Sequence, residues 1–306
     1  MINRFITFLL SCLLGVAVSA TTYSQQIADP HFNASVEHPA YTKNFPRVLF
    51  DEAHNNFHTT TGRYKPFADL IFSDGYQVVV NRNPFARTSL QTFKILVIAN
   101  ALGAEDMDDD GAGSPAFTAE ESETVREWIQ GGGCLLLIAD HAPFGSAAEI
   151  LAKRLGVDMS KGYTLDPVNS DQESKIPSFI VYSRENHLLA DHPITNGRNA
   201  AERVNRVIAF TGQSLKGPDG SDAFMKLADT AHDLVPPGNK ETPAAGRAQG
   251  IAFRLGKGRI VVMGEAGMLT AQVTGSDSRP FGMNIRGIDN RQLVLNIMHW
   301  LSGILK

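Results

Sequence analysis

Histidines, carboxylic acids and amides follow four short apolar runs of this chain, each at the point where a run ends. Such side chains exchange protons near neutral pH or hydrogen-bond polar ligands. We predict His141, Glu52 and Glu265 as catalytic acid–base residues, with either glutamate orienting the imidazole. The predicted ligand-binding residues are Asp51, His54, Asn55, Asn100 and Asp140.

Polar residues follow strands in every α/β protein, because the chain leaves the core there. One such residue therefore indicates little, whereas several polar loops at one sheet edge favour a binding site. For His141, the alternative to a catalytic base is a histidine that hydrogen-bonds the loop backbone. Both interpretations of His141 stay open at the level of sequence.

Two partial motifs raise the question of a metal. His54 and His58 are four residues apart and would share a helical face, with Asp51 and Asp140 as further zinc ligands, but no zinc signature is complete. Asp106, Asp108 and Asp110 match the first half of a calcium loop, whose twelfth position is Phe117 instead of a bidentate glutamate. Calcium or zinc is therefore one option, and a solvated acidic loop is the other.

The elements that would carry these residues alternate between strand and helix. Fully apolar strands are expected at 95–99 and 134–139, and a helix at 65–73 begins with Pro66. A further helix begins after Thr118, which forms a capping box with Glu121. This order predicts an α/β fold with a mostly parallel sheet, helices on both faces, and ligands at the carboxyl ends of the strands.

The remaining predicted elements complete this picture. Strands are expected at 47–50, 77–80, 179–182 and 207–210, a helix from Ser146 to 155, a polar insertion at 157–177, an antiparallel edge hairpin at 251–255 and 259–263, and a last helix at 290–301.

The N-terminus has the pattern of a secretory signal. Arg4 precedes an apolar run from 5 to 18, and Val18-Ser19-Ala20 is a small-residue cleavage site. We therefore expect a signal peptide at 1–20, an irregular arm at 21–45 and one domain at 46–306, in an exported protein that is periplasmic or secreted. No transmembrane span is expected after cleavage. Only Cys134 would remain, so no internal disulfide is possible.

Composition narrows the classes of protein. The 306 residues include 28 Lys+Arg and 32 Asp+Glu, a net charge of −4, and 43% are hydrophobic. These values exclude wholesale disorder and a multi-span membrane protein. The mildly acidic balance also argues against nucleic acid as a partner.

Three segments together resemble a known superfamily. The segment 128–141, with its three glycines before an apolar strand, resembles the helix–glycine–strand–elbow of class I glutamine amidotransferase-like proteins, nearest to their ThuA-like and uncharacterised branches. The segments 191–197 and 256–264 resemble further motifs of that branch. The resemblance implies a flavodoxin-like three-layer sandwich.

The chain departs from that superfamily at its catalytic turn. True amidotransferases carry a nucleophilic cysteine there, whereas this chain has Asp140-His141, and Cys134 opens the strand instead. A thioester glutaminase is therefore not expected, and no Gly-x-Ser-x-Gly elbow replaces it. We expect an exported protein that binds or hydrolyses a small polar ligand, with a carbohydrate-like ligand as an option added by the resemblance. The alternative is a non-catalytic binding or envelope-assembly module whose partner is an envelope protein.

Overall fold

The computed structural model describes residues 26–275 and 278–306. The expected signal peptide at 1–20 lies outside the described residues, as does the beginning of the expected arm.

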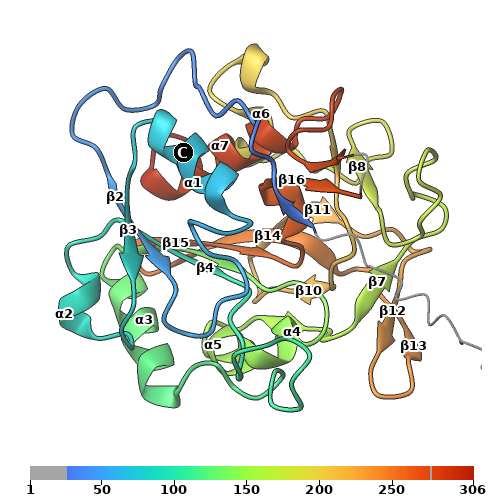
Figure 1. Cartoon of the computed structure of the whole chain (residues 1–306), viewed down its shortest axis with the longest axis horizontal. Coiled ribbons are helices and arrows are strands. Elements are labelled where there is room, and N and C mark those ends of the chain that lie inside the picture. The colour runs from blue at the N-terminus through green and yellow to red at the C-terminus, as the bar shows by residue number, and fades with distance from the viewer. Residues whose placement is uncertain (1–25, 276–277) are drawn as a thin grey trace, which may run out of the picture.

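A nine-stranded sheet forms the centre of the molecule, in the order β3-β2-β4-β5-β15-β14-β10-β6, with β11 also paired to β14 (Figure 1). The first five of these strands run parallel. In chain order they lie 2-1-3-4-5, an arrangement that opens a crevice at the carboxyl ends where the order reverses. The strands are β2 (Arg47–Asp51), β3 (Gln77–Asn81), β4 (Ile95–Ala99), β5 (Cys134–Ile138), β6 (Asp158–Met159), β10 (Leu215–Lys216), β11 (Asp222–Lys226), β14 (Ala248–Leu255) and β15 (Gly258–Met263).

The predicted hairpin forms, but its predicted place at the sheet edge is wrong. β15 pairs in parallel with β5, and β14 continues the sheet toward β10. All six residues of β15 are buried, because both faces of this strand are covered. The last strand on this side of the sheet is instead β6, within the predicted insertion.

Side-chain alternation along the strands builds two apolar clusters, one on each face of the sheet. In β5, Leu136 belongs to one cluster and Leu135 to the other. Helices α1 (Lys65–Ser73) and α7 (Asn290–Ser302) cover the first face, whereas α3 (Ala119–Gln130) and α5 (Glu149–Arg154) cover the second (Figure 1). The chain therefore has a mixed α/β fold with a largely parallel sheet and additional antiparallel strands.

The predicted helix starts are confirmed with one exception. The Thr118 hydroxyl accepts a hydrogen bond from Glu121 N, so α3 begins where the capping box predicted. The helix expected from Ser146 instead begins at Phe144, and it is divided into α4 (Phe144–Ala147) and α5. This short α4 directly follows the loop that carries Asp140 and His141.

Smaller elements surround the sheet. The predicted insertion contributes β6 and β7, and β1 from the predicted irregular arm pairs with β16. These elements are β1 (Ile27–Ala28), α2 (Arg87–Leu90), β7 (Tyr163–Leu165), β8 (Val181–Ser183), α6 (Pro193–Asn196), η1 (Ala200–Glu202), β9 (Arg206–Ile208), β12 (His232–Val235), β13 (Lys240–Pro243), η2 (Gly267–Leu269), β16 (Ala271–Thr274) and β17 (Arg279–Gly282).

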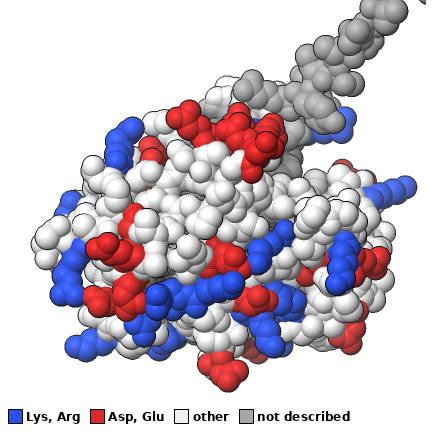
Figure 2. All heavy atoms as spheres, turned by 90° about the horizontal axis from the view of Figure 1, so that it is seen from below, with Lys and Arg blue, Asp and Glu red and all other residues white. Residues whose placement is uncertain are grey.

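The surface carries charges of both signs. On the face seen in Figure 2, Lys and Arg side chains are interspersed with Asp and Glu side chains rather than gathered into one patch. Among the helices of the described residues, none combines the length and apolar character that a bilayer crossing requires.

Candidate functional site

A cavity of about 210 Å³ lies at the carboxyl ends of the parallel strands. It brings together side chains from the loops after β2, β4, β5 and β15, and rings from several other segments close its sides. The lining residues are Gln26, Phe57, His58, Arg63, Asn100, Met107, Asp140, His141, Phe144, Phe210, Glu265, Gly267, Gln272 and Phe281.

Two buried carboxyl groups form the acidic part of the cavity. Burial raises the pKa of Glu265 to about 8, and the charge of Asp140 contributes to this shift. Burial likewise raises the pKa of Asp140 to about 7. Backbone N–H groups of Gly267 and Met268 donate to the two Glu265 oxygens at 2.6 and 2.8 Å, and His141 N donates to Asp140 at 2.8 Å. The pair therefore holds a proton near neutral pH, as interacting buried carboxyls do.

His141 presents one ring nitrogen to the backbone and keeps the other available. Its Nδ1 lies 2.7 Å from Ala142 O, so Nδ1 carries the proton and Nε2 carries the lone pair. The ring stacks on Tyr163 with centroids 4.7 Å apart. Burial lowers the pKa of His141, so the imidazole is neutral near pH 7. The two interpretations of His141 drawn from sequence are therefore compatible.

Asn100 directly follows β4 and has a left-handed conformation, with φ at 51°. Its Oδ1 accepts a hydrogen bond from Asp140 N at 3.0 Å, which ties the ends of β4 and β5 together. Its buried Nδ2 has no partner among the described residues, and the same holds for His58 Nδ1 and Gln272 Oε1. Buried polar atoms are normally hydrogen-bonded, and these three belong to residues that line the cavity, so a polar ligand is a candidate partner for them.

His58 also lines the cavity, and its imidazole is neutral. Burial lowers its pKa to about 3, with a further contribution from the charge of Arg63. Its ring stacks on Tyr64 with centroids 4.6 Å apart.

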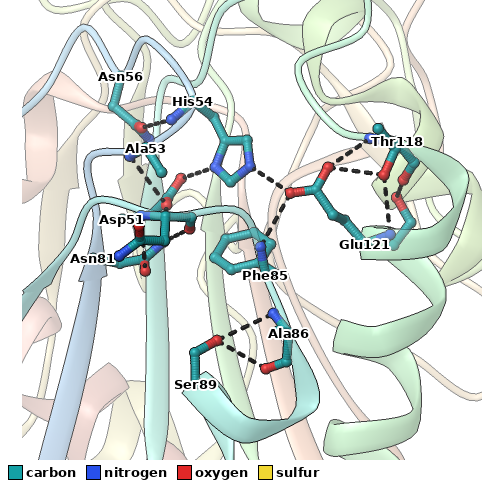
Figure 3. A network of polar contacts seen from close by, with 12 residues as sticks. Asp51, Ala53, His54, Asn56, Asn81, Phe85, Ala86, Ser89, Thr118 and Glu121 are labelled. Atoms are coloured by element: carbon teal, nitrogen blue, oxygen red, sulfur yellow. Dashed lines mark hydrogen bonds and ion pairs between the residues drawn. The ribbon is translucent and has the colours of Figure 1, made fainter.

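Asp51 and His54 belong to a separate network (Figure 3). His54 Nδ1 donates to Asp51 at 2.8 Å and Nε2 to Glu121 at 3.0 Å, while Phe85 N also donates to Glu121. Burial lowers the pKa of His54, but the hydrogen bonds and charges of Asp51 and Glu121 outweigh this effect and raise it. The network joins the end of β2 to the start of α3, and neither Asp51 nor His54 lines the cavity. The capping box anticipated Glu121 at the start of α3, but nothing in the sequence linked it to His54.

Glu52 and Asn55 also lie outside the cavity. Glu52 N donates to Asn81 O, so the chain continues beside edge strand β3 and carries Glu52 away from β5 and β15. The Glu52 carboxylate accepts bonds from Thr60 N and Oγ1 at 2.8 and 2.7 Å. Asn55 is exposed. The expectation that Glu52 faces His141 across a common cleft is therefore not met, and Glu265 takes that place.

The described residues contain no group of three or more histidine, cysteine or acidic side chains that could hold a metal ion. His54 and His58 lie in a loop, so their spacing does not give them a common helical face. Asp106, Asp108 and Asp110 lie exposed in the loop before α3. Cys134 is buried at the opening of β5, at the end of the sheet away from the cavity.

The cavity also contains residues that were not predicted as site residues, above all Arg63 and Gln272. Arg63 precedes α1 in a polar loop, and Gln272 comes from β16 in a different sheet. Neither residue follows a strand of the parallel sheet, so the strand-end pattern does not point to them.

Comparisons with known proteins identify the fold but no family: no family model and no curated protein matches the chain. Among solved structures, the mmIFT52 N-terminal domain has a TM-score of 0.59 at 14% identity and covers 84% of this chain and 97% of that domain. At such low identity the match shows a shared fold alone.

Two more distant structures bear names related to the resemblance noted above. A ThuA-like protein from Bacteroides uniformis has a TM-score of 0.42 at 11% identity, covering 89% of this chain and 95% of that one. A GMP synthase-like protein from Thermoplasma acidophilum has a TM-score of 0.41 at 10% identity, covering 85% of this chain and 96% of that one. Both names agree with an amidotransferase-like fold, but the TM-scores are too low to support an argument.

Proposed function

We propose that the cavity binds a small polar ligand and hydrolyses it by acid–base catalysis. The observation that carries this proposal is the convergence of Asp140, His141 and Glu265 on one cavity at the carboxyl edge of the sheet. Three polar atoms of cavity-lining residues, counted among the described residues, lack a partner and support the binding of a polar molecule there.

The proposed reaction assigns one role to each group. His141 Nε2 accepts a proton from a water molecule as its oxygen forms a bond to the electrophilic carbon of the ligand. The bond from that carbon to the leaving group breaks, and the leaving atom takes the proton held by the Asp140–Glu265 pair. General acid–base catalysis of this kind typically contributes about 10²–10⁴-fold in rate. Proton transfer back from His141 to the pair restores the starting state.

We further propose an exported protein of amidotransferase-like fold with flavodoxin-like layering. Support for export is the pattern of residues 1–20, and support for the layering is the 2-1-3-4-5 strand order with apolar clusters on both faces. A carbohydrate-like ligand stays an option that comes from the resemblance only.

A non-catalytic binding module is the second candidate. The polar atoms of Asn100, His58 and Gln272 that lack a partner in the described part of the chain favour it as much as they favour an enzyme, because they require a ligand but no turnover.

A hydrolase panel of small esters, lactones, amides and glycosides tests the two candidates, using the wild type, His141→Ala and His31→Ala. His31 is an exposed histidine outside the cavity and serves as the matched control. Catalysis predicts at least about 100-fold loss of turnover for His141→Ala and none for His31→Ala. Absence of turnover by the wild type on every substrate, with thermal stabilisation by one of them, would favour the binding module.

A further inference from the structure

The guanidinium of Arg63 brings a positive charge to the cavity wall. Its central carbon lies 4.6 Å from the centre of the Phe57 ring. Within the described part of the chain, its side chain forms no ion pair with either cavity carboxyl group. A guanidinium stays charged at any ordinary pH and presents a planar fork of donors that matches a carboxylate.

The backbone around this cation is fixed to the segment that follows Glu265. Thr270 Oγ1 donates to Arg63 O at 2.6 Å, and the buried Tyr64 hydroxyl donates to Ala266 O at 2.7 Å. Arg63 therefore belongs to a built wall of the cavity, beside the stacked His58 and Tyr64 rings.

Other atoms of the cavity define the rest of a ligand. Among the described residues, Asn100 Nδ2 is a free donor, Gln272 Oε1 is a free acceptor, and His141 Nε2 has a lone pair. Hydroxyl groups both donate and accept hydrogen bonds, so they can satisfy all three. We propose, building on the proposed function, that the ligand contains a small hydroxylated carboxylate part, represented by glycerate, whose carboxylate binds Arg63 and whose hydroxyl groups face Asn100, Gln272 and His141.

Size and charge restrict the ligand further. The cavity of about 210 Å³ equals roughly seven water volumes at ~30 Å³ each, which suits a molecule of the size of glycerate. A dianionic phosphate is less suitable, because a second negative charge would enter a cavity that already holds Asp140 and Glu265.

Calorimetric titration of the full chain tests this proposal with glycerate and its neutral isostere glyceramide. Glycerate should bind at least about 10-fold more tightly than glyceramide, because only glycerate forms the charge-assisted bidentate pair. Arg63→Gln should weaken glycerate binding by about 10- to 100-fold and leave glyceramide binding unchanged. Arg63→Lys keeps the charge but loses the planar fork of donors, so its affinity for glycerate should lie between those of the wild type and Arg63→Gln.

Arg254→Gln is the matched control, since Arg254 is an exposed arginine on β14. Circular dichroism and melting curves establish that each variant is folded. Equal affinity for glycerate and glyceramide, equal affinity of wild type and Arg63→Gln, tighter binding of inorganic phosphate, or failure of glycerate, lactate and acetate alike to bind would each overturn the carboxylate assignment. Loss of turnover of a neutral substrate in His141→Ala would in that case leave the proposed function intact.

Discussion

Replacing Asp140 with asparagine should make the fold more stable at neutral to alkaline pH. Asp140 and Glu265 are both buried and line the same cavity, with pKa values raised to about 7 and about 8. Between the unfolded pKa, near 4, and these values, the native state holds protons that the unfolded state releases. Unfolding free energy therefore falls as pH rises through this window, opposite to the usual behaviour of a salt-bridged carboxylate.

The magnitude follows from the two raised pKa values. Each lies roughly three above its ordinary value, and a difference of one in pKa corresponds to 1.36 kcal/mol, so each carboxyl contributes a loss of up to roughly 4 kcal/mol by pH 8. Asp140→Asn removes one of these contributions and also the repulsion that adds to the effect of burial on the pKa of Glu265. The variant should match the wild type near pH 4 and exceed it by up to roughly 4 kcal/mol at pH 8. An asparagine Oδ1 can still accept the bond from His141 N.

Urea unfolding from pH 4 to pH 8, followed by tryptophan fluorescence, measures this difference. Asp229→Asn, at an exposed aspartate, is the control and should run parallel to the wild type. Parallel curves for Asp140→Asn and wild type would refute the reasoning, because the two carboxyls would not then share a buried charge.

Other predictions concern the base and the supporting network. For His141→Gln, turnover should fall at least about 100-fold. In the wild type the acid limb of the pH–rate profile should lie below pH 6.5, because burial lowers the pKa of His141. Steady-state kinetics across pH measures both effects, and an unchanged rate in His141→Gln would contradict the role of His141 as the base. Glu121→Gln should lower the free energy of unfolding by about 1–3 kcal/mol, and by more at pH 6 than at pH 9. The pKa of His54 is raised, so protonated His54 stabilises the fold at low pH, and this stabilisation is lost as pH rises through that pKa. Denaturant unfolding at pH 6 and pH 9 measures the loss, and an equal loss at both would count against the ion pair between His54 and Glu121. Thr118→Ala should cost about 1 kcal/mol through the lost cap of α3, measured in the same way; no loss would mean that the cap contributes nothing.

The strands of the parallel sheet and the helices α1, α3 and α7 were readable from the sequence because their signals are local. Continuous apolar runs indicated strands covered on both faces, and Thr118 with Glu121 marked a helix start within one turn. The place of the hairpin in the sheet was not readable, because pairing of β15 with β5 joins segments more than a hundred residues apart. Local pattern fixes what an element is but not its neighbour.

The candidate site was readable only in part for the same reason. The strand-end rule brought Asn100, Asp140, His141 and Glu265 to one edge, and these four line the cavity. The same rule also selected Asp51 and His54, but the His54 ring bonds Asp51 on one side and Glu121 on the other, in a network apart from the cavity. Only the path of the loop after a strand decides whether its polar residues face the cavity.

A crystal structure of the chain grown with glycerate tests the proposed site most directly. We predict the carboxylate within hydrogen-bond distance of the Arg63 guanidinium and a hydroxyl group beside His141 Nε2, inside the cavity at the carboxyl edge of the sheet. Glycerate bound elsewhere, with the cavity between Asp140, His141 and Glu265 occupied by water alone, would contradict it.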